Sequence, residues 1–192
     1  MAIPRFPPIP PEHLTAEQRR IADEIMLGRK SLDGPFNAML RSPGIADPFQ
    51  KIGAYLRFAS PLPARLKELA IIVVARYWSA EYEWYVHRRL ALEAGLSKEA
   101  ANLIEDGVRP DLAGEEAAFF DFVVSLLTTG FVDDALFLTI KNRFGEDGVS
   151  ELIAIVGYYS SVSFFLNSDK APLPEGAQKM KVLESRAFSD QI

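Results

Sequence analysis

Apolar side chains recur every three to four residues along most of the chain, a spacing that predicts amphipathic α-helices. Side chains that can accept hydrogen bonds from a first helical turn mark three of the starts, at Thr15, Ser79 and Ser97. No segment alternates convincingly with a period of two, so we predict an all-α fold without a sheet. We expect helices over residues 15–28, 36–40, 47–58, 64–78, 79–94, 114–129, 133–144 and 148–166, with a further one starting at residue 97.

The segment 64–78 differs from the other predicted helices because it is apolar on nearly every side. A helix with no polar face must be buried all round, so we expect this one to form the centre of the core. The longest mostly apolar stretch, 152–166, is shorter than the roughly 20 residues that span a bilayer. We therefore predict no membrane association.

The first thirteen residues are rich in proline, which cannot donate a backbone hydrogen bond inside a helix. We expect an extended arm over 1–13, within a single domain that occupies residues 1–192. The N-terminus has no charged start followed by an apolar run, so it does not resemble a signal peptide. A cytoplasmic protein is the expectation.

Charge and cysteine content exclude several classes of function. The formal net charge is −5 and the basic residues are scattered, which argues against binding to nucleic acid. The chain has no cysteine. Disulfide redox chemistry, thiolate nucleophiles and thiolate metal sites are therefore impossible.

Two glutamates and a histidine are the strongest candidates for catalysis. Glu83 and His87 are four residues apart, so they lie one turn from each other on the predicted helix. Glu68 lies in the apolar helix, where a carboxylate needs a partner, and His87 is the natural one. Such a pair can exchange protons near neutral pH. The alternative is that Glu68 pairs with Arg65 or Arg76 at a helix surface and His87 makes only a buried contact.

The aromatic residues around this point can form the wall of a small-molecule pocket. We expect Tyr82 and Trp84 to bind substrate, and Arg76 to hold the carboxylate of an anionic one. Core packing or an oligomer interface is the alternative role for the aromatic residues. Ion pairs at the surface or between subunits are the alternative for the arginine.

The stretch from Leu66 to Ala70 and from Ala80 to His87 resembles the carboxymuconolactone decarboxylase/AhpD-like family. In the alkylhydroperoxidase branch of that family, a glutamate precedes a C-x-Y-C-x-x-x-H motif. Glu68, Tyr82 and His87 match the glutamate, the tyrosine and the histidine, whereas Ala80 and Glu83 stand at the two cysteine positions. The resemblance implies an AhpD-like helical bundle assembled as trimers or hexamers, with Glu68 and His87 in one site. It does not carry over peroxidase activity, because no thiol is present.

The leading hypothesis is a cofactor-independent enzyme that acts on a small organic acid or lactone by decarboxylation, isomerisation or proton transfer. His87 would be the general acid/base, Glu68 would orient it, and Glu83 would be a second carboxylate. We expect no cofactor and no metal. A Glu/Glu/His metal site and a non-catalytic oligomeric binding or scaffold protein are the alternatives. An open pocket beside His87 would argue against the scaffold.

Overall fold

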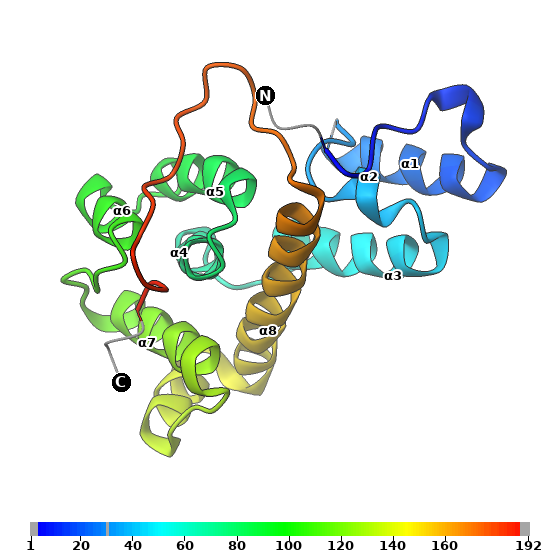
Figure 1. Ribbon diagram of the computed structural model, residues 1–192. Coiled ribbons are helices and arrows are strands. Elements are labelled where there is room, and N and C mark those ends of the chain that lie inside the picture. Colours follow the sequence, from blue (N-terminus) through cyan, green and yellow to red (C-terminus); the bar gives the residue numbers. More distant parts are fainter. Residues whose placement is uncertain (1–3, 30, 189–192) are drawn as a thin grey trace.

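The computed structural model describes residues 4–29 and 31–188, and all regular structure within them is helical, as predicted (Figure 1). A short 3-10 turn, η1, precedes the first α-helix, and a π-helical turn, η2, follows the third. The elements are η1 (Pro11–His13), α1 (Ala16–Arg29), α2 (Phe36–Met39), α3 (Pro43–Ala54), η2 (Tyr55–Ala59), α4 (Ala64–Tyr77), α5 (Glu81–Glu93), α6 (Lys98–Glu105), α7 (Gly114–Thr129) and α8 (Asp134–Asp169).

Helix α4 lies at the centre of the molecule, and α5, α7 and α8 pack around it (Figure 1). Its apolar side chains between Leu69 and Ala75 are almost completely buried. The helix without a polar face is therefore the core element, as expected. Helices α1, α2 and α3 lie on the other side of α8 from α6 and α7 (Figure 1).

Several predicted helix ends agree with the structure. Thr15 and Gln18 bond each other reciprocally at the start of α1, where Thr15 Oγ1 accepts from the Gln18 amide and Gln18 Oε1 accepts from the Thr15 amide. Ser97 Oγ accepts from the Ala100 amide at 3.0 Å and caps α6. Helix α7 occupies 114–129 as predicted.

Two other helices depart from the prediction. Helix α3 begins at Pro43, not near Asp47, because a proline at the first helical position loses no hydrogen bond, and Pro48 is accommodated in the interior. The predicted helices 133–144 and 148–166 are continuous as α8 apart from a break at Gly145, whose φ is 73°. Helix α8 also extends to Asp169.

Ser79 does not cap α5, so this prediction was wrong. Its backbone is left-handed, with φ 51°, and the N-cap position belongs to Ala80. A residue with this φ reverses the chain sharply between α4 and α5. The two helices therefore pack against each other directly, which places Glu68 opposite the first turns of α5.

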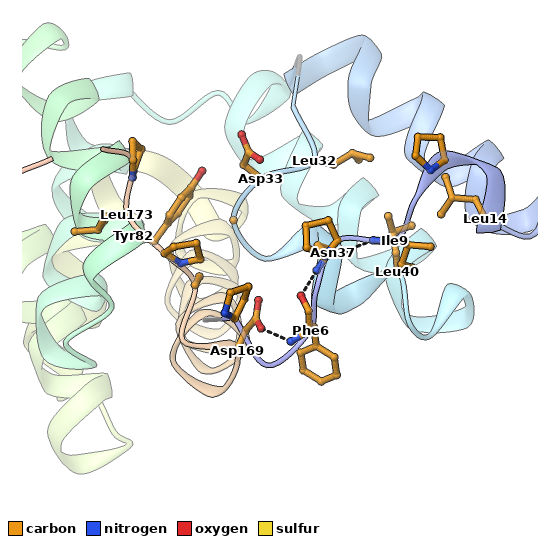
Figure 2. Close-up of a pocket in the computed structure, with 17 residues that line it drawn as sticks. Phe6, Ile9, Leu14, Leu32, Asp33, Asn37, Leu40, Tyr82, Asp169 and Leu173 are labelled. Carbon is orange, nitrogen blue, oxygen red and sulfur yellow. Dashed lines mark hydrogen bonds between the residues drawn. The ribbon is translucent and has the colours of Figure 1, made fainter. Parts of the chain in front are cut away.

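The N-terminal arm is attached to the body of the same chain. From Pro4 onward it is extended up to the 3-10 turn at Pro11–His13, while residues 1–3 of the predicted arm lie outside the described residues. The Phe6 amide donates to Asp169 Oδ1 at 2.7 Å, and Asn37 Nδ2 donates to the Phe6 carbonyl at 2.5 Å. The arm is thereby fixed to both α2 and the end of α8 (Figure 2).

Helix α8 is the one described helix that is long and apolar enough to cross a membrane. Its most apolar window is 56% buried within the fold, and the helix is interrupted at Gly145. These features are those of a core helix.

Candidate active site

The structure brings the three proposed catalytic residues together where α4 packs on α5. His87 Nδ1 lies 2.7 Å from Glu68 Oε2, and His87 Nε2 lies 3.0 Å from Glu83 Oε1. The side chains are buried, with 4% of His87, 6% of Glu83 and 13% of Glu68 exposed. The imidazole is thus held between two carboxylates in an environment with little solvent screening.

This arrangement determines the protonation state of His87. Burial by itself lowers the pKa of the imidazole, but the charges of Glu83 and Glu68 and their hydrogen bonds outweigh it and raise the pKa to about 9. At neutral pH the ring is therefore an imidazolium. Its Nδ1–H donates to Glu68 of α4, and its Nε2 forms an ion pair with Glu83 of α5.

The alternative pairing of Glu68 with an arginine is not observed. Arg65 pairs instead with Glu116, at 3.1 Å between Nε and Oε1. Arg76 is only 1% exposed, and its Nε and Nη2 have no hydrogen-bond partner among the described residues.

A pocket of about 260 Å³ opens beside the histidine, so this part of the molecule is not collapsed. Both His87 and Glu83 line it, whereas Glu68 does not. The Tyr159 ring stands nearly perpendicular to the imidazole, with ring centroids 5.2 Å apart. Most of the remaining wall is aromatic or basic, from Arg29, Phe36, Arg57, Tyr82, Arg89 and Tyr158, and Asp33 adds a carboxylate. A pocket of this size suits a small molecule.

Of the three proposed substrate-binding residues, only Tyr82 lines this pocket. Burial, assisted by Asp33 and Glu83, raises the pKa of Tyr82 to about 12, so the phenol stays protonated. Trp84 is buried on another side of α5 and borders a separate hollow with Arg88. Arg76 borders none of the pockets described here.

A second pocket, of about 430 Å³, shares part of its wall with the first. Figure 2 shows the residues that line this second pocket. The proline-rich arm, α2 and the segment after α8 enclose it, and its lining is mostly apolar. Tyr82 and Asp33 line both pockets. The Tyr82 ring packs on Gly34, where an added Cβ would lie 2.8 Å from the ring, and the positive φ of 75° also requires glycine.

The sequence reasoning missed Arg29, Arg57, Tyr158 and Tyr159 as pocket residues. Arg29 ends α1 and Arg57 lies in the π-helical turn, so they reach the site only through tertiary packing. A π-helical turn often marks a functional region, but it has no clear sequence signal.

A buried polar network holds the π-helical turn that carries Arg57. The Tyr55 hydroxyl donates to Glu151 Oε1 at 2.6 Å, and the Ser60 hydroxyl donates to the other carboxylate oxygen. Lys67 Nζ donates to the Ser60 carbonyl at 3.2 Å. These contacts join both ends of the turn to α8 and α4.

The three site residues do not form a metal centre in this geometry. Glu68 and Glu83 approach different nitrogens of the same ring, so no single point faces donor atoms from all three. Within residues 4–29 and 31–188, no group of three or more His, Asp or Glu side chains is arranged to hold an ion.

The fold and site define the chain as an AhpD-like helical bundle with an acid–imidazole–acid cluster between two core helices. The model of the Carboxymuconolactone decarboxylase family matches residues 43–123, which contain Glu68, Glu83 and His87. This match and the shared fold confirm the predicted resemblance to that family. No curated protein matches the chain by sequence.

Solved structures share the fold at low sequence identity. An uncharacterized peroxidase-related protein from Silicibacter sp. TM1040 superposes with a TM-score of 0.70 at 11% identity, over 88% of this chain and 90% of that one. The debrominase Bmp8 gives a TM-score of 0.68, both as the apo protein at 13% identity and as a cysteine-to-alanine variant with 2,3,4-tribromopyrrole at 14%. Each Bmp8 comparison covers 89% of this chain and 92% of the other. These similarities concern the fold alone.

Proposed function

We propose that the chain is a cofactor-independent acid/base enzyme that acts on a small organic acid or lactone. The observation that carries the proposal is the buried Glu68–His87–Glu83 cluster, two members of which line an open pocket. Titratable groups with strongly shifted pKa values are typical of catalytic pockets. The family match over residues 43–123 supports the same reading at a coarser level.

The contacts within the cluster suggest a role for each group. His87 is the acid. Its Nε2–H faces Glu83 but also borders the pocket, so it can donate its proton to a substrate atom there. Glu83 is the base that removes a proton from the substrate carbon, so one proton leaves the substrate as another arrives. Glu68 is a positioning residue, because it holds Nδ1–H and stabilises the imidazolium without lining the pocket.

Thiol peroxidase activity is not part of the proposal. Peroxide reduction by a thiol needs a cysteine to supply electrons, and the chain has none. Ala80 and Glu83 stand where the resemblance places the two cysteines. Neither the peroxidase-related name nor the debrominase activity of the structural neighbours is transferred to this chain.

The test is exchange of carbon-bound hydrogen, which needs no knowledge of the final product. A panel of small lactones and oxo acids is incubated with the protein in D₂O, and loss of C–H signals is followed by ¹H NMR. We expect exchange with the wild-type protein and a loss of roughly a hundredfold or more in His87→Gln and Glu83→Gln. His13→Gln is the matched control, because His13 is the other histidine and lies in the arm. Full activity in His87→Gln would end the proposal and favour the binding or scaffold alternative.

We also propose a homo-oligomer, a trimer or hexamer, located in the cytoplasm. Exposed apolar side chains gather on α3 and η2, where Ile45, Ile52, Tyr55 and Phe58 are each about half exposed. Exposed apolar side chains of this kind suit contact between subunits. Light scattering coupled to size-exclusion chromatography tests the state, and a monomer at all concentrations would contradict it.

A further inference from the structure

The pocket beside His87 contains two guanidinium groups that pair with no carboxylate of the described chain. Six other arginines form an ion pair, namely Arg20, Arg65, Arg88, Arg89, Arg109 and Arg143. Arg29 and Arg57 line the pocket, and within residues 4–29 and 31–188 neither has such a partner. Guanidinium groups without a counter-charge at a pocket are suited to bind an anion.

Arg29 is the more telling of the two. Its Nη2 is buried and has no hydrogen-bond partner among the described residues. A buried charged donor without an acceptor is costly, so its persistence in a pocket wall calls for an explanation such as a ligand. The guanidinium lies 4.9 Å from the centroid of the Phe36 ring and 5.8 Å from that of Phe58, which holds it in place.

The backbone of α3 is shaped to admit this side chain. A Cβ on Gly53 would lie 2.9 Å from Arg29 Nη2 and 2.0 Å from the Tyr158 hydroxyl oxygen. Any side chain at Gly53 would therefore displace two residues of the pocket wall. The absence of a side chain at Gly53 brings the Arg29 guanidinium and the Tyr158 hydroxyl close to α3.

Among the described residues, the carboxylates near the pocket form no ion pair with Arg29 or Arg57. Glu83 is occupied by His87, and Glu24, on the same helix as Arg29, contacts Arg20 and Gln50. Asp33 also lines the pocket, but the structure contains no ion pair between it and either arginine. Arg89 lines the same pocket but pairs with Glu93 at 2.7 Å, and its side chain is 64% exposed.

We propose that Arg29, with Arg57, is the carboxylate anchor of this site, and that its ligand is a small organic carboxylate. The anchor comes from α1 and η2, whereas the acid/base groups come from α5. A ligand whose carboxylate binds Arg29 would therefore extend the rest of its structure toward Glu83 and His87. The volume of about 260 Å³ holds on the order of nine water molecules, which suits a ligand the size of benzoate. The inference rests on the proposed function for its catalytic meaning, but binding can be tested separately.

The probe pair is benzoate and benzamide, which have nearly the same shape but differ in charge. Affinities are measured by calorimetry on the full chain for the wild type, Arg29→Met, Arg29→Lys and Arg89→Met. Methionine keeps an apolar stem against Phe36 and removes the charge, and lysine restores the charge without the planar fork. Arg89→Met is the matched control, because it removes one charge from the same pocket where an ion pair already satisfies it.

We expect benzoate to bind the wild type, with affinity falling roughly tenfold or more in Arg29→Met, partly recovering in Arg29→Lys and staying within about twofold in Arg89→Met. Benzamide should bind weakly and equally to all four proteins. Thermal unfolding separates an anchor from a structural residue. Without ligand, Arg29→Met should keep or raise the unfolding temperature, and only its stabilisation by benzoate should disappear. A lower unfolding temperature without ligand would indicate a structural role and overturn the proposal.

Equal benzoate affinity in Arg29→Met and the wild type would also overturn it. So would the absence of benzoate binding to the wild type, as expected if a second copy of the chain supplies a carboxylate to Arg29. The anchor and the catalytic proposal fail in different ways. Benzoate binding that depends on Arg29, with no hydrogen exchange on any candidate, retains the anchor and removes the enzyme. Hydrogen exchange that is lost in His87→Gln but unchanged in Arg29→Met would retain the enzyme and remove the anchor.

Discussion

The protonation of His87 provides the most quantitative prediction. Burial opposes the charge on the ring, yet the two neighbouring carboxylates raise its pKa from 6.5 to about 9. At about 1.4 kcal/mol per pKa unit, this rise corresponds to about 3 kcal/mol of stability contributed by the imidazolium. A raised pKa means that the native state binds the proton more tightly than the unfolded chain does. The contribution is therefore complete below pH 6.5 and is lost as the pH rises through about 9.

The assay combines NMR with chemical denaturation. The chain has only two histidines, so ¹³C-labelled histidine gives two ring signals, and the His13→Gln variant assigns them. We expect the His87 signal to titrate near pH 9. The free energy of unfolding, measured with urea from about pH 6 to about pH 9.5, should fall by about 3 kcal/mol from this group.

The Glu83→Gln variant removes the carboxylate charge that faces His87 Nε2 at 3.0 Å. The pKa of His87 should fall, and the loss of stability with rising pH should become smaller than in the wild type. Burial lowers the pKa of Lys67, so the contribution of this residue to stability increases with pH. Because Lys67 is present in both proteins, its contribution cancels in the comparison. A His87 midpoint at or below pH 6.5 in the folded wild type would refute the reasoning, because desolvation would then outweigh the carboxylates.

Three further predictions concern the frame of the site. Gly34→Ala should destabilise the protein by about 1–3 kcal/mol in urea unfolding, because the φ of 75° is strained for alanine and the new Cβ would meet the Tyr82 ring; unchanged stability would contradict this packing. Asp169→Ala should cost about 1–3 kcal/mol and speed proteolysis of the arm, because the Phe6 amide loses its acceptor, whereas a cleavage rate equal to that of the wild type would show that the arm is held by other contacts. Ser97→Ala should cost about 1 kcal/mol in the same unfolding assay through loss of the α6 cap, and a change of less than about 0.3 kcal/mol would argue against the bond.

Local patterns in the chain were sufficient for most of the fold. The absence of a polar face placed α4 in the core, because such a helix must be buried on all sides. The cap at Ser97 could be predicted because its hydrogen bond joins residues within one helical turn. Ser79 was misread because the same residue type also occurs in left-handed turns, and neighbouring sequence does not decide between the two.

For the candidate site, too, some features followed from the sequence and others only from tertiary packing. The sequence alone determined that Glu83 and His87 share a helix face, because four residues make about one helical turn. It also determined that no thiol chemistry is available. The resemblance suggested that Glu68 joins His87, but only packing of α4 on α5 produced the 2.7 Å contact.

Tertiary structure alone decided which cations face the pocket. Arg29 and Arg57 enter it from α1 and the π-helical turn, whereas Arg76, which is close to Glu68 along the chain, lies outside it. Spacing along one helix predicts neighbours on that helix. Residues from separate elements meet only when the whole core has assembled, so their contacts depend on the packing of many side chains at once.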